Sequence, residues 1–138
     1  MSENLFAILV HGQSGPFESL KRMLRELSVE TYSVATCQEA ASLIPQCKPH
    51  MVFTESTVAD GTWLSVFNSA EAADAPLRVI VVGTFPDTKC YLSLMERGAF
   101  DFVAPPFERE PLSFVVRSAA LDTLRRRGVL AAQTVGAS

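Results

Sequence analysis

The residues best suited to do chemistry in this sequence come directly after short apolar segments. Glu55 offers a carboxylate, His11 an imidazole and Thr84 a hydroxyl, which are the groups of an acid, a base and a nucleophile. All the positions of this kind are His11, Gly12 and Gln13, then Glu55, then Gly83 and Thr84, and finally Pro105. These residues can form one functional site only if the fold brings them close together.

Histidine chemistry is weakly indicated. His11 could be a base or a metal ligand, but the only other histidine, His50, is expected at the opposite end of its strand. Ser14, Ser56 and Thr84 could act as nucleophiles beside His11, yet the sequence has no G-x-S-x-G motif and no assigned orienting acid. We therefore interpret His11 as a pocket-lining residue and expect no enzymatic activity.

The segment at residues 12–15, Gly-Gln-Ser-Gly, follows an apolar run and precedes a helix, as a phosphate-binding loop would. It has neither the GxGxxG nor the GxxxxGK[ST] pattern. A tight strand-to-helix turn is the favoured interpretation, and nucleotide binding is kept as an alternative.

Strand-like and helix-like segments alternate along the chain. Apolar or β-branched runs predict strands at residues 5–10, 31–36, 50–55, 78–82 and 100–104. Helical spacing follows each strand: near Pro16, over residues 38–46, after Thr62, from Pro86 to Gly98, and from Glu108 to Arg127. Buried strands alternating with helices predict a doubly wound α/β fold, a parallel sheet with helices on both faces. Ligands of such sheets bind beyond the carboxyl ends of the strands, where the residues named above lie.

Composition narrows the class of function. Of the 138 residues, 48% are hydrophobic and 20% charged, and the net charge is -3, so we expect one folded domain that does not bind nucleic acid. No apolar run approaches a membrane span, and the N-terminus lacks a secretory signal. The 3 cysteines have no CxxC spacing, which argues against disulfides and zinc. We expect a cytoplasmic domain at residues 1–127 and a flexible C-terminal tail at 128–138.

Two segments resemble the receiver domains of bacterial two-component response regulators. GAFDFVAPPFEREPL, residues 98–112, is similar to the GADDYLxKPF stretch of that family. PHMVFTESTVADGTW, residues 49–63, is similar to the strand and loop that carry its phosphorylated aspartate. The resemblance spans about residues 5–127 and implies a five-stranded sheet in the order 2-1-3-4-5 within a flavodoxin-like three-layer sandwich. It also implies a cis bond between Pro105 and Pro106.

The chemistry of that family needs four groups. An acidic pair after the first strand holds Mg²⁺, and an aspartate at the end of the third strand attacks the phosphoryl donor. A Ser or Thr after the fourth strand and a Lys after the fifth bind the phosphoryl oxygens and neutralise their charge.

This chain departs from the family at nearly every one of those positions. The acidic pair falls on Gly12 and Gln13, or on His11 and Gly12, and the acceptor aspartate on Glu55. The hydroxyl position is Gly83 or Thr84, the lysine position is Pro105, and Phe102 stands where the family has an aromatic residue that reports the switch.

The departures predict that Glu55 is not phosphorylated. Glutamate carries its carboxylate about 1.5 Å farther out than aspartate, and a misplacement of about 1 Å can cost roughly 10²-fold in rate. With the metal-binding acids and the lysine missing, we expect neither metal nor other cofactor. Glu55 is then either a permanent negative charge in the place of the phosphoryl group or a solvated carboxylate without a switching role.

The last helix carries two apolar stripes, of which one can face the sheet. They are Leu112, Val115, Val116 and Ala119, and Phe114, Leu121 and Leu124. Because receiver-like domains associate through their fourth and fifth helices and last strand, the resemblance favours the second stripe as an interface. Ordinary surface packing of these side chains is the alternative.

We therefore interpret the chain as a stand-alone receiver-like module of phosphorelay signal transduction that acts by protein-protein contact. Its partner would be a kinase, a regulator, an output protein or a second copy of the chain, and neither nucleic acid nor a membrane. Two alternatives stay open: a receiver that still accepts phosphate, and a flavodoxin-like domain that binds a small ligand or nucleotide.

Overall fold

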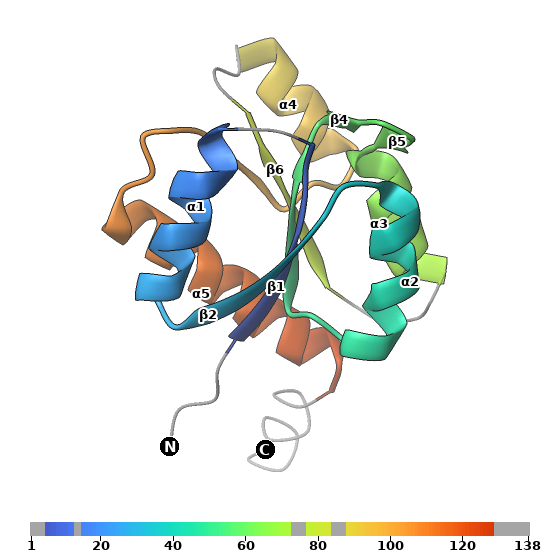
Figure 1. Ribbon diagram of the computed structural model, residues 1–138, viewed down its shortest axis with the longest axis horizontal. Helices are drawn as coiled ribbons and strands as arrows, with labels where there is room; N and C mark the ends of the chain where they lie inside the picture. Colours follow the sequence, from blue (N-terminus) through green and yellow to red (C-terminus); the bar gives the residue numbers. More distant parts are fainter. Residues whose placement is uncertain (1–4, 13–14, 73–76, 84–87, 129–138) are drawn as a thin grey trace.

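Five parallel strands form the central sheet of the computed structural model, which describes residues 5–12, 15–72, 77–83 and 88–128 (Figure 1). The order across the sheet is β2-β1-β3-β6-β7, which confirms the predicted 2-1-3-4-5 once only the strands of this sheet are counted. The strands are β1 (Leu5–Val10), β2 (Val29–Val34), β3 (Met51–Glu55), β6 (Arg78–Val82) and β7 (Asp101–Val103).

The central strand β1 explains why an unbroken apolar run is needed there. Ala7, Ile8, Leu9 and Val10 are all fully buried, because successive side chains point to opposite faces and helices cover both faces. β1 pairs in parallel with β2, Leu5 opposite Val29, and with β3, Ala7 opposite Met51.

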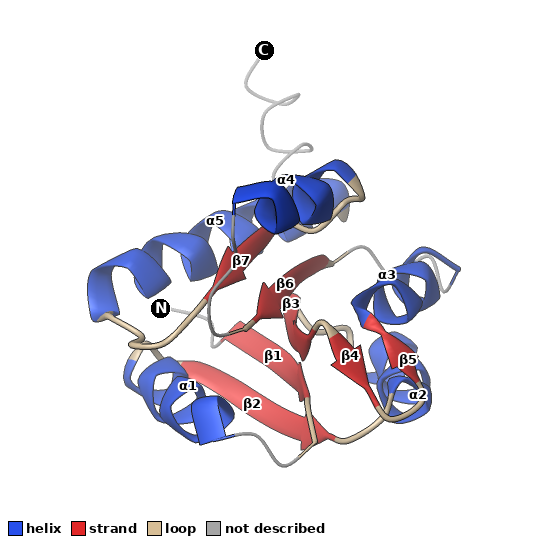
Figure 2. Cartoon of the chain, turned by 90° about the horizontal axis from the view of Figure 1, so that it is seen from above, coloured by secondary structure: helices blue, strands red, loops and turns tan. Residues whose placement is uncertain are grey.

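Helices pack on both faces of the sheet and complete three layers (Figure 2). On one face, α1 (Gly15–Glu26) and α5 (Arg109–Arg126) form a core with Ala7 and Leu9 of β1. On the other face, α2 (Cys37–Cys47), α3 (Trp63–Ala72) and α4 (Thr88–Glu96) form a core with Ile8 and Val10. None of the described helices is both long and apolar enough to cross a membrane.

The segment after β3 holds a small hairpin that the sequence did not predict. β4 (Thr57–Val58) pairs antiparallel with β5 (Gly61–Thr62) before α3 begins, around the Asp60-Gly61 turn that the sequence did indicate. Strands of two residues show no alternation of apolar and polar side chains, so no pattern distinguishes them from loop.

Hydrogen bonds and backbone angles at the helix ends explain where α2 and α4 begin or end. Thr36 caps α2 by accepting the Glu39 N–H, and the Glu39 carboxylate accepts the N–H of Ala35, the residue before the cap. This helix was predicted over residues 38–46; it extends by one residue at each end, contains Pro45 in its last turn and ends at Lys48, whose φ of 48° is left-handed. Gly98, with φ of 113°, follows the end of α4 as predicted.

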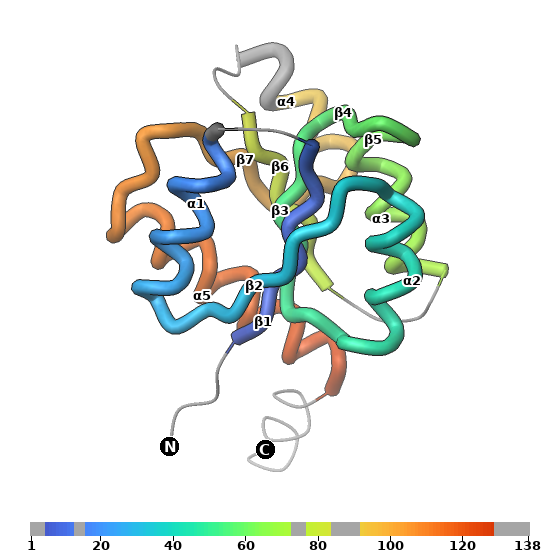
Figure 3. Tube along the Cα trace, viewed as in Figure 1, coloured from blue at the N-terminus to red at the C-terminus, as the bar shows by residue number. Residues whose placement is uncertain are grey.

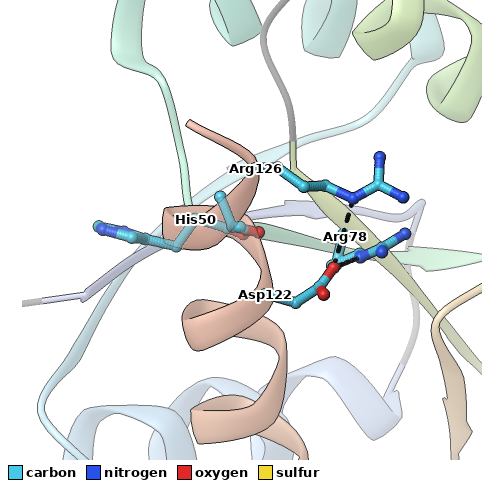
Figure 4. A network of polar contacts seen from close by, with 5 residues as sticks. His50, Arg78, Asp122 and Arg126 are labelled. Atoms are coloured by element: carbon cyan, nitrogen blue, oxygen red, sulfur yellow. Dashed lines mark hydrogen bonds and ion pairs between the residues drawn. The ribbon is translucent and has the colours of Figure 1, made fainter. Parts of the chain in front are cut away.

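A polar network fixes the end of α5 to the amino ends of two strands (Figure 4). The Asp122 carboxylate pairs with the Arg78 guanidinium of β6 and with Arg126, 3.4 Å away. The Thr123 hydroxyl donates to the His50 carbonyl oxygen at 2.7 Å. His50, whose Nδ1 accepts the Phe6 N–H, therefore lies at the opposite end of the sheet from His11, as the sequence analysis expected.

Candidate functional site

The carboxyl ends of β1, β3 and β6 meet at the upper edge of the sheet in the chain trace (Figure 3). Parallel pairing brings Val10 beside Thr54, and Glu55 beside Val82. The residues that follow these strands are therefore neighbours in space although they are far apart in sequence. A pocket of about 230 Å³ lies at this edge and is lined by Pro16, Phe17, Glu55, Ser56, Thr57, Val82 and Gly83.

Glu55 turns toward the loop that follows β1. Its Oε1 accepts a hydrogen bond from the Gly12 backbone N–H at 2.9 Å. The longer side chain of glutamate thus reaches a main-chain donor on the neighbouring strand end. Of the pocket-lining residues within the described part of the chain, Glu55 alone carries an ionisable side chain.

His11 is held by contacts on both of its ring nitrogens. Nδ1 donates to the Gly12 carbonyl oxygen at 2.6 Å, which leaves Nε2 to pair with the Ser33 hydroxyl of β2 at 3.3 Å. The ring also stacks on Phe17, with centroids 4.3 Å apart and planes 16° apart. These contacts give His11 a structural role at the rim and leave neither ring nitrogen directed to Glu55.

The segment considered as a phosphate cradle is only partly described. Gln13 and Ser14 lie outside the described residues. The Gly12 N–H, the described amide that would face a phosphate, is already bonded to Glu55. The contact therefore supports a strand-to-helix turn closed by a carboxylate.

The Phe102 ring fills the space that a side chain at residue 83, at the end of β6, would need. A Cβ added to Gly83 would lie 2.7 Å from Cζ of the Phe102 ring. The ring is half-buried and packs against the core on the α2–α3–α4 face of the sheet. Thr84, the other candidate for the hydroxyl position, lies outside the described residues.

Pro105 brings no charge to the site. The bond between Pro105 and Pro106 is cis, as the resemblance implied. Beyond it, a second pocket of about 260 Å³ is lined largely by apolar side chains of the loop and of α5: Phe102, Val103, Ala104, Pro106, Phe107, Glu108, Pro111, Leu112 and Val115.

Asp60 has a structural role that the sequence analysis missed. Its carboxylate accepts the N–H groups of Cys37 at 2.7 Å and of Gln38 at 3.0 Å, in the first turn of α2. The hydrogen bond from Cys37 is the main reason why the pKa of Asp60 lies below its usual value. Burial, followed by the nearby negative charge of Asp60, raises the pKa of the Cys37 thiol. The Asp60-Gly61 turn is visible in the sequence, but nothing in the sequence indicates that this carboxylate caps a helix 23 residues upstream.

The two apolar stripes of α5 differ in how deeply they are buried. Leu112, Val115, Val116 and Ala119 are buried against the sheet. Phe114 and Leu121 remain 71% and 50% exposed, and Leu124 is half-buried. The outward face of α5 thus exposes two large apolar side chains, Phe114 and Leu121, among charged ones such as Arg117.

The fold of the chain is similar to that of solved receiver domains. The signal receiver domain of a protein described as a LuxO repressor, from Vibrio parahaemolyticus, aligns with a TM-score of 0.77 and 19% identity, over 92% of this chain and 98% of that one. A two-component response regulator from Clostridium difficile aligns at 0.68 and 21%, over 90% and 98%.

The receiver domain of a sensor histidine kinase from Pseudomonas aeruginosa, solved with a magnesium ion coordinated in its active site cleft, aligns at 0.73 and 16%, over 86% of this chain and 98% of that one. No protein-family model and no curated protein matches the sequence.

Proposed function

We propose that this chain, which has the fold of response-regulator receiver domains, is a cytoplasmic signalling module of a bacterial phosphorelay that acts by protein contact and does not accept phosphate. One observation carries the proposal. Glu55 lies where the resemblance would place the phosphorylated aspartate. Its Oε1 accepts a hydrogen bond from the Gly12 N–H, 2.9 Å away, where the resemblance would place an acid that holds Mg²⁺. A carboxylate bonded in this way connects the ends of two neighbouring strands.

The residues at this edge do not fit Mg²⁺. The ion requires oxygen ligands in near-octahedral geometry and is usually held by one or two carboxylates. Among the described residues that line the pocket, Glu55 is the single carboxylate, and Gly12 and Gly83 have no side-chain oxygen. Across the part of the chain that the structure describes, no three His, Cys, Asp or Glu side chains gather as metal ligands. The proposed function therefore includes no step through this ion.

Among the described residues that line the pocket, none carries a positive charge that could stabilise a phosphoryl group. In phosphoryl transfer, positive charge must stand where negative charge grows. Pro105 occupies the position that the resemblance assigns to a lysine. A phosphoryl group on Glu55 would thus lack both the metal and the ammonium that stabilise it.

Glu55 has a better-supported role as a structural carboxylate than as a permanent substitute for the phosphoryl group. One carboxylate carries less charge than an acyl phosphate. The Gly12 N–H that it accepts belongs to the adjacent loop, so the bond joins the ends of β1 and β3. This geometry favours an edge of the sheet that keeps one structure over an edge that switches between two.

The outward face of α5 is the surface on which the proposed contact depends. Phe114 and Leu121 lie seven residues apart and are both exposed, so they share one side of the helix, with Arg117 on the turn between them. Large apolar side chains exposed on one side of a small domain are typical of protein-binding surfaces. The partner would be a kinase, a regulator, an output protein or another copy of the chain.

Affinity capture tests this proposal. The full chain would be immobilised and exposed to a lysate of the source cell, and captured proteins would be identified by mass spectrometry. We expect wild type and Glu55→Gln to capture the same signalling protein, and Phe114→Glu to lose it. Tyr32→Glu is the matched control, because Tyr32 is an aromatic residue on the edge strand β2 that is 54% exposed. Equal capture by Phe114→Glu, or loss of capture in Glu55→Gln, would contradict the proposal.

A further inference from the structure

The pocket of about 230 Å³ at Glu55 has a charge that its own walls do not balance. Among the described residues that line it, Glu55 contributes a negative charge and none contributes a positive one. None of the ion pairs that the described residues form includes Glu55. The pocket therefore favours a ligand that brings a positive charge of its own.

The Glu55 carboxylate is fixed before any ligand arrives. Its Oε1 accepts the Gly12 N–H at 2.9 Å, and the residue is half-buried. Its other oxygen, Oε2, has no hydrogen-bond partner among the described residues. A carboxylate accepts several hydrogen bonds, so an incoming N–H donor meets an acceptor whose position is already set. Binding then has one side chain less to order.

Hydroxyl groups lie beside this carboxylate. Ser56 and Thr57 follow Glu55 in the chain and line the same pocket. An ammonium group carries three N–H donors and no acceptor, and carboxylate and hydroxyl oxygens are acceptors for such donors. The polar part of the pocket thus suits a primary ammonium group.

The rest of the described lining is apolar. It comes from Pro16, Phe17 and Val82, while Gly83 adds no side chain. The Phe17 ring is held by stacking on His11, with centroids 4.3 Å apart. Such a surface favours an alkyl chain and offers nothing to a hydrated metal ion, which requires oxygen ligands.

The volume limits the ligand to a few heavy atoms. Pockets for drug-sized ligands measure about 300 to 1,000 Å³. At the about 30 Å³ that a water molecule takes up in the liquid, the heavy atoms of n-butylammonium need roughly 150 Å³. The pocket of about 230 Å³ admits such an ion and is too small to enclose a nucleotide.

We propose that this pocket binds a small primary alkylammonium ion, with its ammonium group on the Glu55 carboxylate and its alkyl chain on the apolar lining. The inference goes beyond the proposed function, which concerns contact with a protein through the outward face of α5. A free amine is the source that we assign, because the proposed function expects Glu55→Gln to capture the same partner and so leaves no lysine of that partner in the pocket.

Amide chemical shifts of the full chain test the pocket directly. n-Butylammonium is added at neutral pH from about 0.1 mM to about 20 mM. We expect saturable shifts at Gly12, Ser56 and Gly83 with a dissociation constant of about 1 mM, since a charge-assisted hydrogen bond and a short alkyl chain supply the affinity. Gly12 is the most informative amide, because its N–H is bonded to the carboxylate that the ligand would contact.

Two further probes separate charge and hydrogen bonding from size. 1-Butanol has the length of n-butylammonium without its charge, and tetramethylammonium has the charge without an N–H donor. We expect each to bind at least about tenfold more weakly, because neither forms a charge-assisted hydrogen bond from an ammonium group. Equal binding of either probe would overturn the inference.

Substitution of Glu55 tests the carboxylate. Glu55→Gln keeps an oxygen for the Gly12 N–H and removes the charge, so n-butylammonium should bind it at least about tenfold more weakly. Glu71→Gln removes a charge from an exposed residue at the end of α3 and is the matched control, with the affinity of wild type expected. Thermal unfolding verifies that both variants are folded.

The assignment fails if the shifts do not saturate by about 20 mM, or if Glu55→Gln binds n-butylammonium as wild type does. Tighter binding of Nα-acetyl-lysine amide than of n-butylammonium would overturn the free amine as the source and assign the pocket to a lysine side chain. The proposed function is judged separately, by capture through Phe114 and by the mass of the chain after treatment with a phosphoryl donor.

Discussion

The Phe102 ring lies against Gly83 so closely that a Cβ at residue 83 would come within 2.7 Å of its Cζ. Glycine at this position is what allows the ring to remain packed against the core. A hydroxyl-bearing side chain at residue 83 and an inward Phe102 ring would compete for one space. The contact thus links the residue that ends β6 to the aromatic residue of β7.

Gly83→Ser is expected to lower the free energy of unfolding by about 1 to 3 kcal/mol, the usual cost of adding atoms to a packed site. Urea denaturation measures the change. Phe102→Ala should remove most of that cost when it is combined with Gly83→Ser. Gly12→Ala is the control, because its added Cβ would meet Glu55 Oε1 only at 4.0 Å and should change stability by less than about 0.5 kcal/mol. Additive losses in the double variant would contradict the contact.

The bond between Glu55 and Gly12 predicts a contrast between two substitutions. Glu55→Ala removes the acceptor of the Gly12 N–H and should cost about 0.5 to 1.5 kcal/mol of unfolding free energy. Glu55→Gln keeps a side-chain oxygen at the same reach and should cost less than about 0.5 kcal/mol. Equal losses in the two variants, measured by denaturation at neutral pH, would mean that this hydrogen bond does not hold the rim.

Asp60 predicts a dependence of stability on acid pH. Its pKa in the folded chain is lowered from the usual 3.8, chiefly by the hydrogen bond from the Cys37 N–H. A carboxyl group with a lowered folded pKa contributes stability that is present above its unfolded pKa and is lost as pH falls through the folded pKa. Wild type should therefore lose stability below about pH 4, and Asp60→Ala should lose less of its own over that range.

Thermal midpoints at pH 7 and pH 3 measure the difference for Asp60. Glu71→Ala, which removes an exposed carboxylate from the end of α3, provides the matched control. The Asp60 explanation fails if Asp60→Ala and Glu71→Ala retain the same acid sensitivity as wild type.

The network around Asp122 should matter more than an exposed ion pair. The Asp122 and Arg78 side chains are 26% and 18% exposed, so Asp122→Ala leaves a poorly hydrated guanidinium without its carboxylate. We expect a loss of about 1 to 2 kcal/mol. Glu26→Ala breaks the Arg109–Glu26 pair, whose side chains are 62% and 52% exposed, and should cost less than about 0.5 kcal/mol. Denaturation curves that rank the two variants in the opposite order would contradict this account of the network.

The sequence predicted the strands that are buried on both faces better than the rest of the fold. The runs at residues 5–10 and 78–82 are strands with the predicted bounds, because only continuous apolar residues suit a strand covered by helices on both faces. The edge strand β2 begins at Val29, two residues earlier than predicted, since an edge strand mixes exposed and buried positions. The β4–β5 hairpin was missed because its strands are too short to show a period.

The candidate site was predictable in its position and not in its contacts. The sequence placed His11, Gly12, Glu55 and Gly83 at one edge, because the carboxyl ends of parallel strands lie together. The hydrogen bond from Gly12 to Glu55 joins residues 43 positions apart, and the packing of Phe102 against Gly83 also joins two strands. Both contacts depend on the direction of side chains in different strands, which no local sequence pattern encodes. The roles assigned to these residues stay predictions.

The most direct test of the proposed function is the intact mass of the full chain after incubation with acetyl phosphate and Mg²⁺. A receiver domain with the usual aspartate and lysine, treated in parallel, shows that the donor is active. We predict that this chain keeps its unmodified mass, as Glu55→Gln does. A gain of one phosphoryl group that requires Mg²⁺ and disappears in Glu55→Gln would contradict the account.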